Sequence, residues 1–272
     1  MNLRRWPLIV IGAPIVALIT ARTAAGPTSP IAGPNERVPV IVELFTSEGC
    51  SSCPPADELL TQLVSLQPVS GAEVIALGEH VDYWDRLGWR DPFSSAAYSA
   101  RQADYASKAF HGGDIYTPQM VVNGREALVG SDYRAATAAI ARAARPSGPR
   151  ARVMLKASRD VHASSALFVM QVDAPAGTSL AGSAELFLAL TEDGLVTQVR
   201  RGENSGRQLR HSATTRFLAS VGVVHADARP WTASTTVRLT ADWDLSHMRV
   251  IAFVQDRATK AVLGATSETM TP

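Results

Sequence analysis

Cysteine is scarce in this sequence: only Cys50 and Cys53 occur among its 272 residues. An exported protein held together by disulfides usually distributes several cysteines over long loops, because closing a long loop restricts the unfolded chain more. Both cysteines here lie within one CxxC segment, and so short a bridge contributes little to fold stability. The scarcity excludes a disulfide-stapled scaffold and favours a chemical role for the pair.

Excess charge of either sign is also lacking, since 26 Lys and Arg residues face 25 Asp and Glu residues and the net charge is +1. Removal of the first 25 residues takes away three arginines and no acid, which leaves 23 bases against 25 acids and a net charge of −2. Such a chain has no overall basic field to attract nucleic acid or an anionic membrane. We therefore expect neither as a partner.

The N-terminus predicts an export signal peptide over residues 1–25. Two arginines give it a positive start, Trp6–Ile19 is apolar and uncharged, and Thr23–Ala25 offers small residues for cleavage. The apolar run is shorter than the roughly 20 residues that span a bilayer, and an uncleaved anchor is the alternative. Residues 26–37 are rich in Pro, Gly and Ser, which is typical of a flexible linker. We expect a periplasmic or secreted protein.

Residues 38–146 alternate between strand-like and helix-like patterns. Val38–Phe45 is a nearly continuous apolar run rich in β-branched residues, as in a strand buried on both faces. The two cysteines follow, and Pro54 then opens a segment with leucines at helical spacing. The remaining predicted elements are a strand over Glu73–Val81, helices over Ser94–Phe110 and Tyr133–Arg145, and a hairpin at Asn123-Gly124. The order β-α-β-α-β-β-α predicts an α/β domain.

In residues 150–272 the pattern of apolar runs and turns differs from that of residues 38–146. Strand-like runs such as Leu167–Val172 and Met248–Val254 are separated by turns containing Gly, Pro, Asp and Ser. Several runs alternate apolar and polar residues, as strands with one solvated face do. This pattern predicts a second, mostly antiparallel β-sandwich-like domain.

Three features that are distant in the sequence are expected to meet at one edge of the predicted sheet. The first two strands of a βαβ unit run parallel, so Cys50 and Cys53 lie near the loop after His80. An antiparallel third strand begins at that edge with Thr117-Pro118. A helix N-terminus stabilises a thiolate, so Cys50 is expected to be the nucleophile and Cys53 the resolving thiol. A cis bond at Pro118 beside the sulfurs would let this segment, including Thr117, pair with an extended substrate.

Three further side chains have candidate roles, each with an alternative. Glu43, within the first strand, is predicted to lie under the dithiol, where it relays a proton to Cys53 or rests as a carboxylate satisfied by backbone N–H groups. Tyr83 and Trp84 follow the second predicted strand, where they contact substrate or pack their loop down. Glu43 is therefore a candidate catalytic residue, and the two aromatic residues are candidates for substrate binding.

A strand, a CxxC followed by proline, a helix and a later Thr-Pro before a hairpin resemble the thioredoxin superfamily. The segments Val42–Asp57, His80–Phe93 and Tyr116–Gly124 are more specific, and they resemble the bacterial secreted family known as domain of unknown function 1223 (DUF1223). The resemblance covers most of residues 38–270 and includes Arg201–Asn204. It implies a thioredoxin-like fold for the first domain and a redox centre, and the family has no settled activity to transfer.

Three functions compete. The first is an extracytoplasmic thiol–disulfide oxidoreductase that acts on exported protein thiols or disulfides, with no cofactor beyond the Cys50–Cys53 centre. It requires sulfurs that lie near the Thr-Pro proline and are open to solvent. The second is a copper- or zinc-binding thioredoxin-like carrier or sensor, with Cys50, Cys53 and His80 as ligands together with Asp82 or Glu48. The third is a non-catalytic interaction protein.

One segment of the second domain has two interpretations. Its polar residues are Arg200, Arg201, Glu203, Asn204 and His211. They either form a solvated hairpin or reach over the dithiol.

Overall fold

The structure is a computed structural model that describes residues 37–145, 150–160, 162, 164–175, 180, 183–224 and 230–270. The predicted signal peptide (1–25) and all but the last residue of the predicted linker (26–37) lie outside the described residues. None of the described helices is both long and apolar enough to cross a membrane.

Strands predominate over helices in the described chain. The strands are β1 (Val38–Thr46), β2 (Ala72–His80), β3 (Gln119–Val122), β4 (Glu126–Val129), β5 (Arg152–Asp160), β6 (Ser165–Asp173), β7 (Ala184–Glu192), β8 (Leu195–Gln198), β9 (Gln208–His211), β10 (Thr214–Val223), β11 (Trp231–Arg238), β12 (Met248–Asp256) and β13 (Val262–Thr269). The helices are α1 (Pro54–Leu66), α2 (Ala96–Lys108) and α3 (Tyr133–Ala144), with the short 3-10 helices η1 (Asp82–Leu87) and η2 (Leu245–His247).

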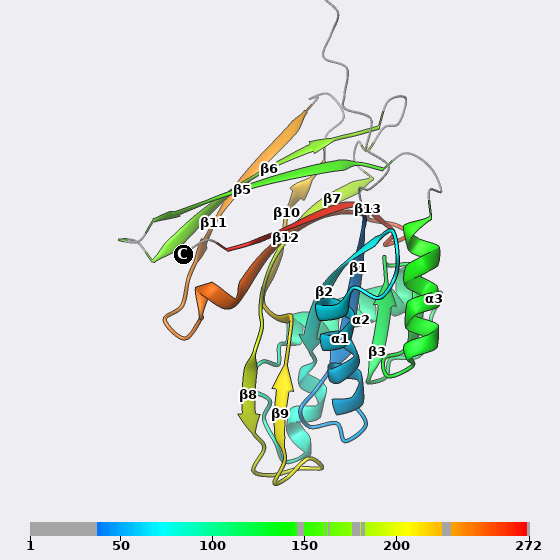
Figure 1. Cartoon of the computed structure of the whole chain (residues 1–272), viewed down its shortest axis with the longest axis vertical. Coiled ribbons are helices and arrows are strands. Elements are labelled where there is room, and N and C mark those ends of the chain that lie inside the picture. Colours follow the sequence, from blue (N-terminus) through cyan, green and yellow to red (C-terminus); the bar gives the residue numbers. More distant parts are fainter. Residues whose placement is uncertain are drawn as a thin grey trace, which may run out of the picture. The chain divides into compact units, whose positions relative to one another are not determined.

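The prediction of a thioredoxin-like α/β domain followed by a β-sandwich-like domain is wrong. One mixed sheet has the strand order β13-β12-β7-β10-β2-β1-β3-β4, so four strands from each half of the chain share it (Figure 1). A smaller sheet has the order β11-β6-β5, and β8 pairs with β9 in a hairpin. The elements of the first half do follow the order β-α-β-α-β-β-α, with η1 added, but β2 is an interior strand with β10 at its side. Apolar periodicity identifies strands and does not identify their neighbours.

Helices and the smaller sheet cover the faces of the large sheet. Side chains of α1 and α3 pack on one face of β1, β2 and β3, in a core that includes Leu44, Leu60 and Ile140. Successive side chains of β1 point to opposite faces, so Phe45 packs instead against Tyr105 of α2. The smaller sheet packs against β7 and β12, and its side chains share another core with theirs.

A backbone hydrogen bond between β2 and the start of β10 joins the two halves of the sheet. The Gly78 N–H of β2 donates to the Ala213 carbonyl at 2.7 Å, and Thr214 of β10 pairs with Gly78 in parallel. A Cβ at position 78 would lie 3.3 Å from the Ala213 oxygen, so glycine permits this close approach. His211, just before this contact, is thereby brought against His80 at the end of β2, with ring centroids 4.9 Å apart.

A buried charged cluster ties α2 to the sheet. Glu43 of β1 accepts hydrogen bonds from Arg101 and Tyr105 of α2, and Arg101 also lies 3.5 Å from the Glu79 carboxylate of β2. Both carboxylates are fully buried, and neither oxygen of Glu79 has a hydrogen-bond partner within the described chain. Burial, reinforced by the Glu43 carboxylate, raises the pKa of Glu79 well above its ordinary value of 4.5. We expect Glu79 to hold its proton at neutral pH.

Glu79→Gln should therefore raise stability near pH 8 more than near pH 4. The unfolded chain releases this proton around pH 4.5 while the folded protein keeps it, so Glu79 costs stability as the pH rises above 4.5. The gain should approach about 1.4 kcal/mol for each pH unit between the two pKa values. Thermal unfolding at both pH values measures it, with Glu73→Gln on the same strand as the control. An equal effect of Glu79→Gln at both pH values would contradict the prediction.

Candidate functional site

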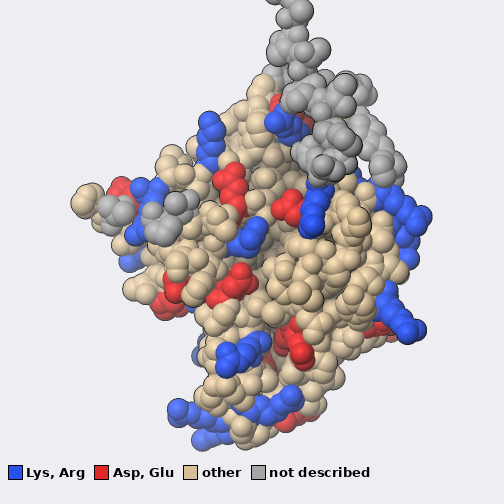
Figure 2. All heavy atoms as spheres, viewed as in Figure 1, with Lys and Arg blue, Asp and Glu red and all other residues tan. Residues whose placement is uncertain are grey.

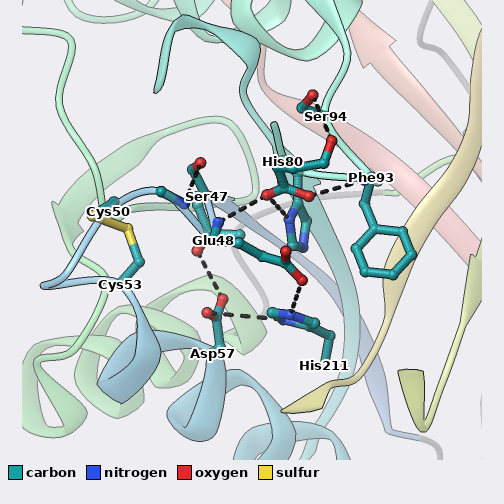
Figure 3. Close-up of polar contacts among 12 residues, drawn as sticks. Ser47, Glu48, Cys50, Cys53, Asp57, His80, Phe93, Ser94 and His211 are labelled. Atoms are coloured by element: carbon teal, nitrogen blue, oxygen red, sulfur yellow. Dashed lines mark hydrogen bonds and ion pairs between the residues drawn. A yellow bond between two sulfur atoms is a disulfide. The ribbon is translucent and has the colours of Figure 1, made fainter. Parts of the chain in front are cut away.

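Cys50 and Cys53 form a disulfide between the end of β1 and the first turn of α1 (Figure 3). Their Cα atoms are 5.4 Å apart. Cys53 immediately precedes Pro54, the first residue of α1, and its carbonyl accepts the Asp57 N–H at 3.1 Å. The pair thus occupies a helix N-terminus, where free N–H groups and the helix dipole favour a thiolate.

Both cysteine side chains are fully buried. The two serines between them, Ser51 and Ser52, are exposed. The oxidoreductase hypothesis requires sulfurs open to solvent, and this state of the protein does not meet that requirement. Access to the sulfurs depends on what covers them.

Residues 199–207, the tip of the β8–β9 hairpin, cover the disulfide loop, and we call them the cover. The Glu203 carboxylate accepts a hydrogen bond from the Ser51 N–H at 2.9 Å. The buried Asn204 amide donates to two carbonyl oxygens of the loop, including that of Cys50 at 3.0 Å. Of the two interpretations of this segment, the observed one is that it reaches over the disulfide.

Trp89 supports the cover from the loop that follows η1. Gly202 of the cover has a φ of +77°, a left-handed conformation that favours glycine, and a Cβ there would lie 3.1 Å from the Trp89 Cβ. The Trp89 indole N–H donates to the Glu48 carboxylate at 2.8 Å. One tryptophan therefore contacts both the cover and the disulfide loop.

The predicted substrate-binding residues form contacts beside the same loop. Trp84 packs against Gly49, where a Cβ would lie 3.1 Å from the Trp84 Cβ, and its indole N–H donates to Thr117 Oγ1 at 2.8 Å. The Thr117–Pro118 peptide bond is cis, and Pro118 is buried just before β3. The Tyr83 hydroxyl instead donates to a glutamine of α2 at 3.1 Å. A role for these residues in substrate binding stays a prediction.

A buried polar network lies next to the disulfide loop (Figure 3). His211 of β9 contacts the Glu48 carboxylate through Nε2 at 3.0 Å, and its Nδ1 lies 3.9 Å from the Asp57 carboxylate. Thr46 Oγ1 donates to the other Asp57 oxygen at 2.8 Å. Burial raises the pKa of Asp57 above its ordinary value of 3.8, although two nearby histidines oppose the rise. A carboxyl with a raised pKa thus lies one helical turn after Cys53.

A second pair of buried groups adjoins the first. His80 Nδ1 lies 2.7 Å from Asp91 Oδ2, and the same oxygen accepts the Glu48 N–H at 2.8 Å. Burial alone would lower the pKa of His80, but the Asp91 carboxylate outweighs burial and raises that pKa to about 9. Burial likewise opposes ionisation of Asp91, and His80 nevertheless lowers the Asp91 pKa. Because Asp91 also accepts the Glu48 N–H, the His80–Asp91 and His211–Glu48 pairs form one cluster.

Glu43 lies on the sheet face opposite α1. Val42 and Leu44 face α1, and side chains alternate along a strand, so Glu43 faces the charged cluster of α2 instead. The buried carboxyls beside the CxxC are instead Glu48, two residues before Cys50, and Asp57. The spacing of four residues between Cys53 and Asp57 places both on one side of a helix, and that signal was present in the sequence.

The side chains named in the metal hypothesis have other partners, and metal binding stays a prediction. Within the described part of the chain, no group of three or more His, Cys, Asp or Glu side chains is placed to hold a metal ion. His80 binds Asp91, and Glu48 binds His211 and Trp89. Sequence reasoning did not identify Asp91 as a partner of His80, because a carboxylate in a loop has no periodicity that fixes its direction.

Comparison with known proteins shows relatives of this fold. The X-ray crystal structure of protein AGR_C_4864 from Agrobacterium tumefaciens is similar, with 25% identity and a TM-score of 0.63, over 87% of this chain and 96% of that one. HBP35 of Porphyromonas gingivalis has a similar fold, with 16% identity and a TM-score of 0.61, over 86% of this chain and 76% of that one. No curated protein matches the sequence. The profile of the family described as "Protein of unknown function (DUF1223)" matches residues 41–255.

Asp91→Asn should remove the counter-charge of His80. We expect the wild-type His80 ring to titrate near pH 9, and in the variant burial should bring the midpoint below 6.5. Because the folded pKa is raised, the stability that the pair contributes is fully present below pH 6.5 and is lost as the pH rises through about 9. Loss of one partner of a buried pair should cost about 3 kcal/mol.

NMR titration of the histidine rings measures the midpoint, and the exposed His111 serves as an internal control that the substitution should leave unchanged. A wild-type His80 midpoint at or below 6.5 would show that the Asp91 carboxylate does not dominate its surroundings.

Proposed function

Because this chain belongs to the family described as protein of unknown function (DUF1223), whose description assigns no activity, we propose from the site that it is an extracytoplasmic thiol–disulfide oxidoreductase. The observation that carries the proposal is the Cys50–Cys53 disulfide at the N-terminus of α1. A bridge across so few residues adds little stability, while the helix end suits a thiolate. The local order of strand, CxxC, helix and cis-proline is similar to that of thioredoxin-like oxidoreductases.

The reaction balances with two thiols of a partner protein. The first partner thiolate attacks the Cys50 sulfur and forms a mixed disulfide, and the bond to Cys53 breaks. Cys53 leaves as a thiolate and takes up a proton. The second partner thiolate then attacks the partner sulfur of the mixed disulfide, and Cys50 leaves as a thiolate. The partner is oxidised to a disulfide, the protein is reduced to a dithiol, and the reverse sequence reduces a partner disulfide.

Asp57 supports the proton transfer to Cys53. Its carboxyl has a raised pKa, and its backbone N–H already binds the Cys53 carbonyl. Asp57 also lines a pocket of about 340 Å³ between α1 and β9, together with Pro54 and residues of β9. This pocket gives the buried carboxyl a route for exchanging its proton with solvent. We assign to Asp57 the role that the sequence had suggested for Glu43.

The burial of the sulfurs makes movement of the cover part of the mechanism. Exposing Cys50 requires the loss of three hydrogen bonds, one to Glu203 and two from Asn204. At about 1 kcal/mol net for each bond, opening costs about 3 kcal/mol, which leaves on the order of one per cent of molecules open. An open population of that size is sufficient for exchange and protects the centre from unselective reaction.

The predicted export signal and the disulfide favour an oxidising compartment, the periplasm or the cell exterior. In such a compartment the partners are exported proteins that carry thiols or disulfides. The centre needs no cofactor in this mechanism because the sulfurs themselves carry the electrons.

Asn204→Ala should speed the reduction of the native disulfide by dithiothreitol about thirtyfold, because two of the three bonds that hold the cover, about 2 kcal/mol, are removed. The reaction is followed by trapping thiols with an alkylating reagent and measuring the mass of the protein. Gln198→Ala, at an exposed position of β8 in the same hairpin, is the control and should react like the wild type. If dithiothreitol reduces neither the wild type nor Asn204→Ala without unfolding it, the oxidoreductase proposal is wrong.

Asp57→Asn should slow the exchange about a hundredfold near neutral pH, because the leaving Cys53 thiolate loses its proton donor. In the wild type the exchange rate should fall as the pH rises through the raised pKa of Asp57, because the carboxyl then loses the proton that it donates. The pH–rate profile of the variant should lack this fall. Comparison in the Asn204→Ala background removes any effect on the cover. Glu58→Gln, on an exposed neighbour in the same helix, is the control. An unchanged pH–rate profile in Asp57→Asn would exclude Asp57 as the donor.

A further inference from the structure

Exposed arginines surround the cover and form what we call the basic tip. Its six members are Arg86, Arg90, Arg200, Arg201, Arg207 and Arg210. The first two belong to the segment of η1 and Trp89, which meets the cover where Gly202 lies against Trp89. Figure 2 shows Lys and Arg gathered over the end of the molecule that β8 and β9 form. Basic side chains from two separate segments therefore gather around the disulfide.

The charges of the basic tip are not neutralised internally. No arginine of the basic tip forms an ion pair with a described side chain, whereas Arg101, Arg142 and Arg216 form ion pairs elsewhere in the fold. The acidic side chains near η1 are already engaged: Asp82 binds Ser99, and Asp85 binds Ser94 and the Asp91 N–H. The six arginines of the basic tip therefore outnumber Glu203, the acidic side chain of the cover, although the chain as a whole is almost neutral.

The carboxylates of an acidic ligand would compete with two of the hydrogen bonds that the cover makes. The Glu203 carboxylate accepts a hydrogen bond from the Ser51 N–H in the loop before α1. Arg207 Nη1 donates to the Asn204 side-chain oxygen at 2.9 Å and so steadies the amide that covers Cys50. Carboxylates of another chain suit both the N–H and the guanidinium, because both are anion-binding groups.

We infer that the basic tip is the docking surface for an acidic segment of the partner protein, and that docking displaces the cover from the disulfide. The inference rests on the proposed function, since it names the kind of protein whose thiols or disulfide reach Cys50. Complementary charge raises the rate of encounter and selects among partners. The same contacts that attract the partner release Glu203 and Asn204, so binding and exposure of the sulfurs are coupled.

Binding of cysteine-free peptides to the oxidised whole protein tests the docking without relying on redox chemistry. Two fluorescent peptides of equal length are compared by anisotropy at low ionic strength, one with alternating glutamate and serine and one with alternating lysine and serine. The glutamate peptide should bind about tenfold or more tightly than the lysine peptide, and added salt should weaken its binding, because exposed charges are screened beyond about 8 Å at physiological ionic strength.

Arg200→Glu/Arg201→Glu should weaken binding of the glutamate peptide about tenfold or more. Arg125→Glu/Arg159→Glu makes the same change of charge at exposed positions in the β3–β4 turn and on β5, and it should leave binding nearly unchanged. Equal binding of the two peptides, or an equal loss in both double variants, would overturn the docking surface.

A second measurement tests the displacement of the cover. A saturating concentration of the glutamate peptide should speed reduction of the wild-type disulfide by dithiothreitol severalfold, and it should have little effect on Asn204→Ala, in which the cover is already loosened. Peptide that binds without speeding reduction would overturn the displacement. If dithiothreitol reduces neither protein, the proposed function fails, and the displacement fails with it, whereas the anisotropy still decides whether the basic tip binds acidic chains.

Discussion

The hydrogen bond between the Gly78 N–H and the Ala213 carbonyl is the contact on which the arrangement of the site depends. It seats the start of β10 beside the end of β2, and the hairpin β8–β9 directly precedes β10 in the chain. His211 consequently lies beside the CxxC loop, and the tip of the hairpin extends over it. The absence of a side chain at Gly78 allows the close approach, so this glycine in an interior strand helps to place the hairpin beside two distant cysteines.

The network beneath the disulfide shows how buried charge is tolerated here. His80 is paired with Asp91, and His211 contacts Glu48, whose backbone N–H binds Asp91 in turn. A buried charge without a partner would cost several kcal/mol, so these groups stabilise one another only while the loop, η1 and β9 stay together. The network therefore couples the position of the hairpin to the position of the disulfide loop.

The same coupling explains why a fully buried disulfide is compatible with a redox function. The cover is held to the loop by three hydrogen bonds from and to Glu203 and Asn204. The core beneath it, built from β1, β2 and α1, does not have to open. Under the proposed function, reactivity is set by how often the tip lifts and by which molecules lift it, and the helix N-terminus and Asp57 set the chemistry once the sulfurs are reached.

The sequence by itself determined the local features of this protein. The apolar run of β1, the CxxC, the proline that opens α1 and the spacing of Asp57 from Cys53 are all set within one or two turns of chain, because periodicity and propensity act between near neighbours. Tertiary structure decided the rest. Which strand lies beside β2, which face of β1 receives Glu43, and whether Glu203 and Asn204 meet solvent or the disulfide loop depend on pairings between residues far apart in the sequence. Those pairings are fixed by packing and by the satisfaction of buried polar groups over the whole sheet, and no local pattern specifies them.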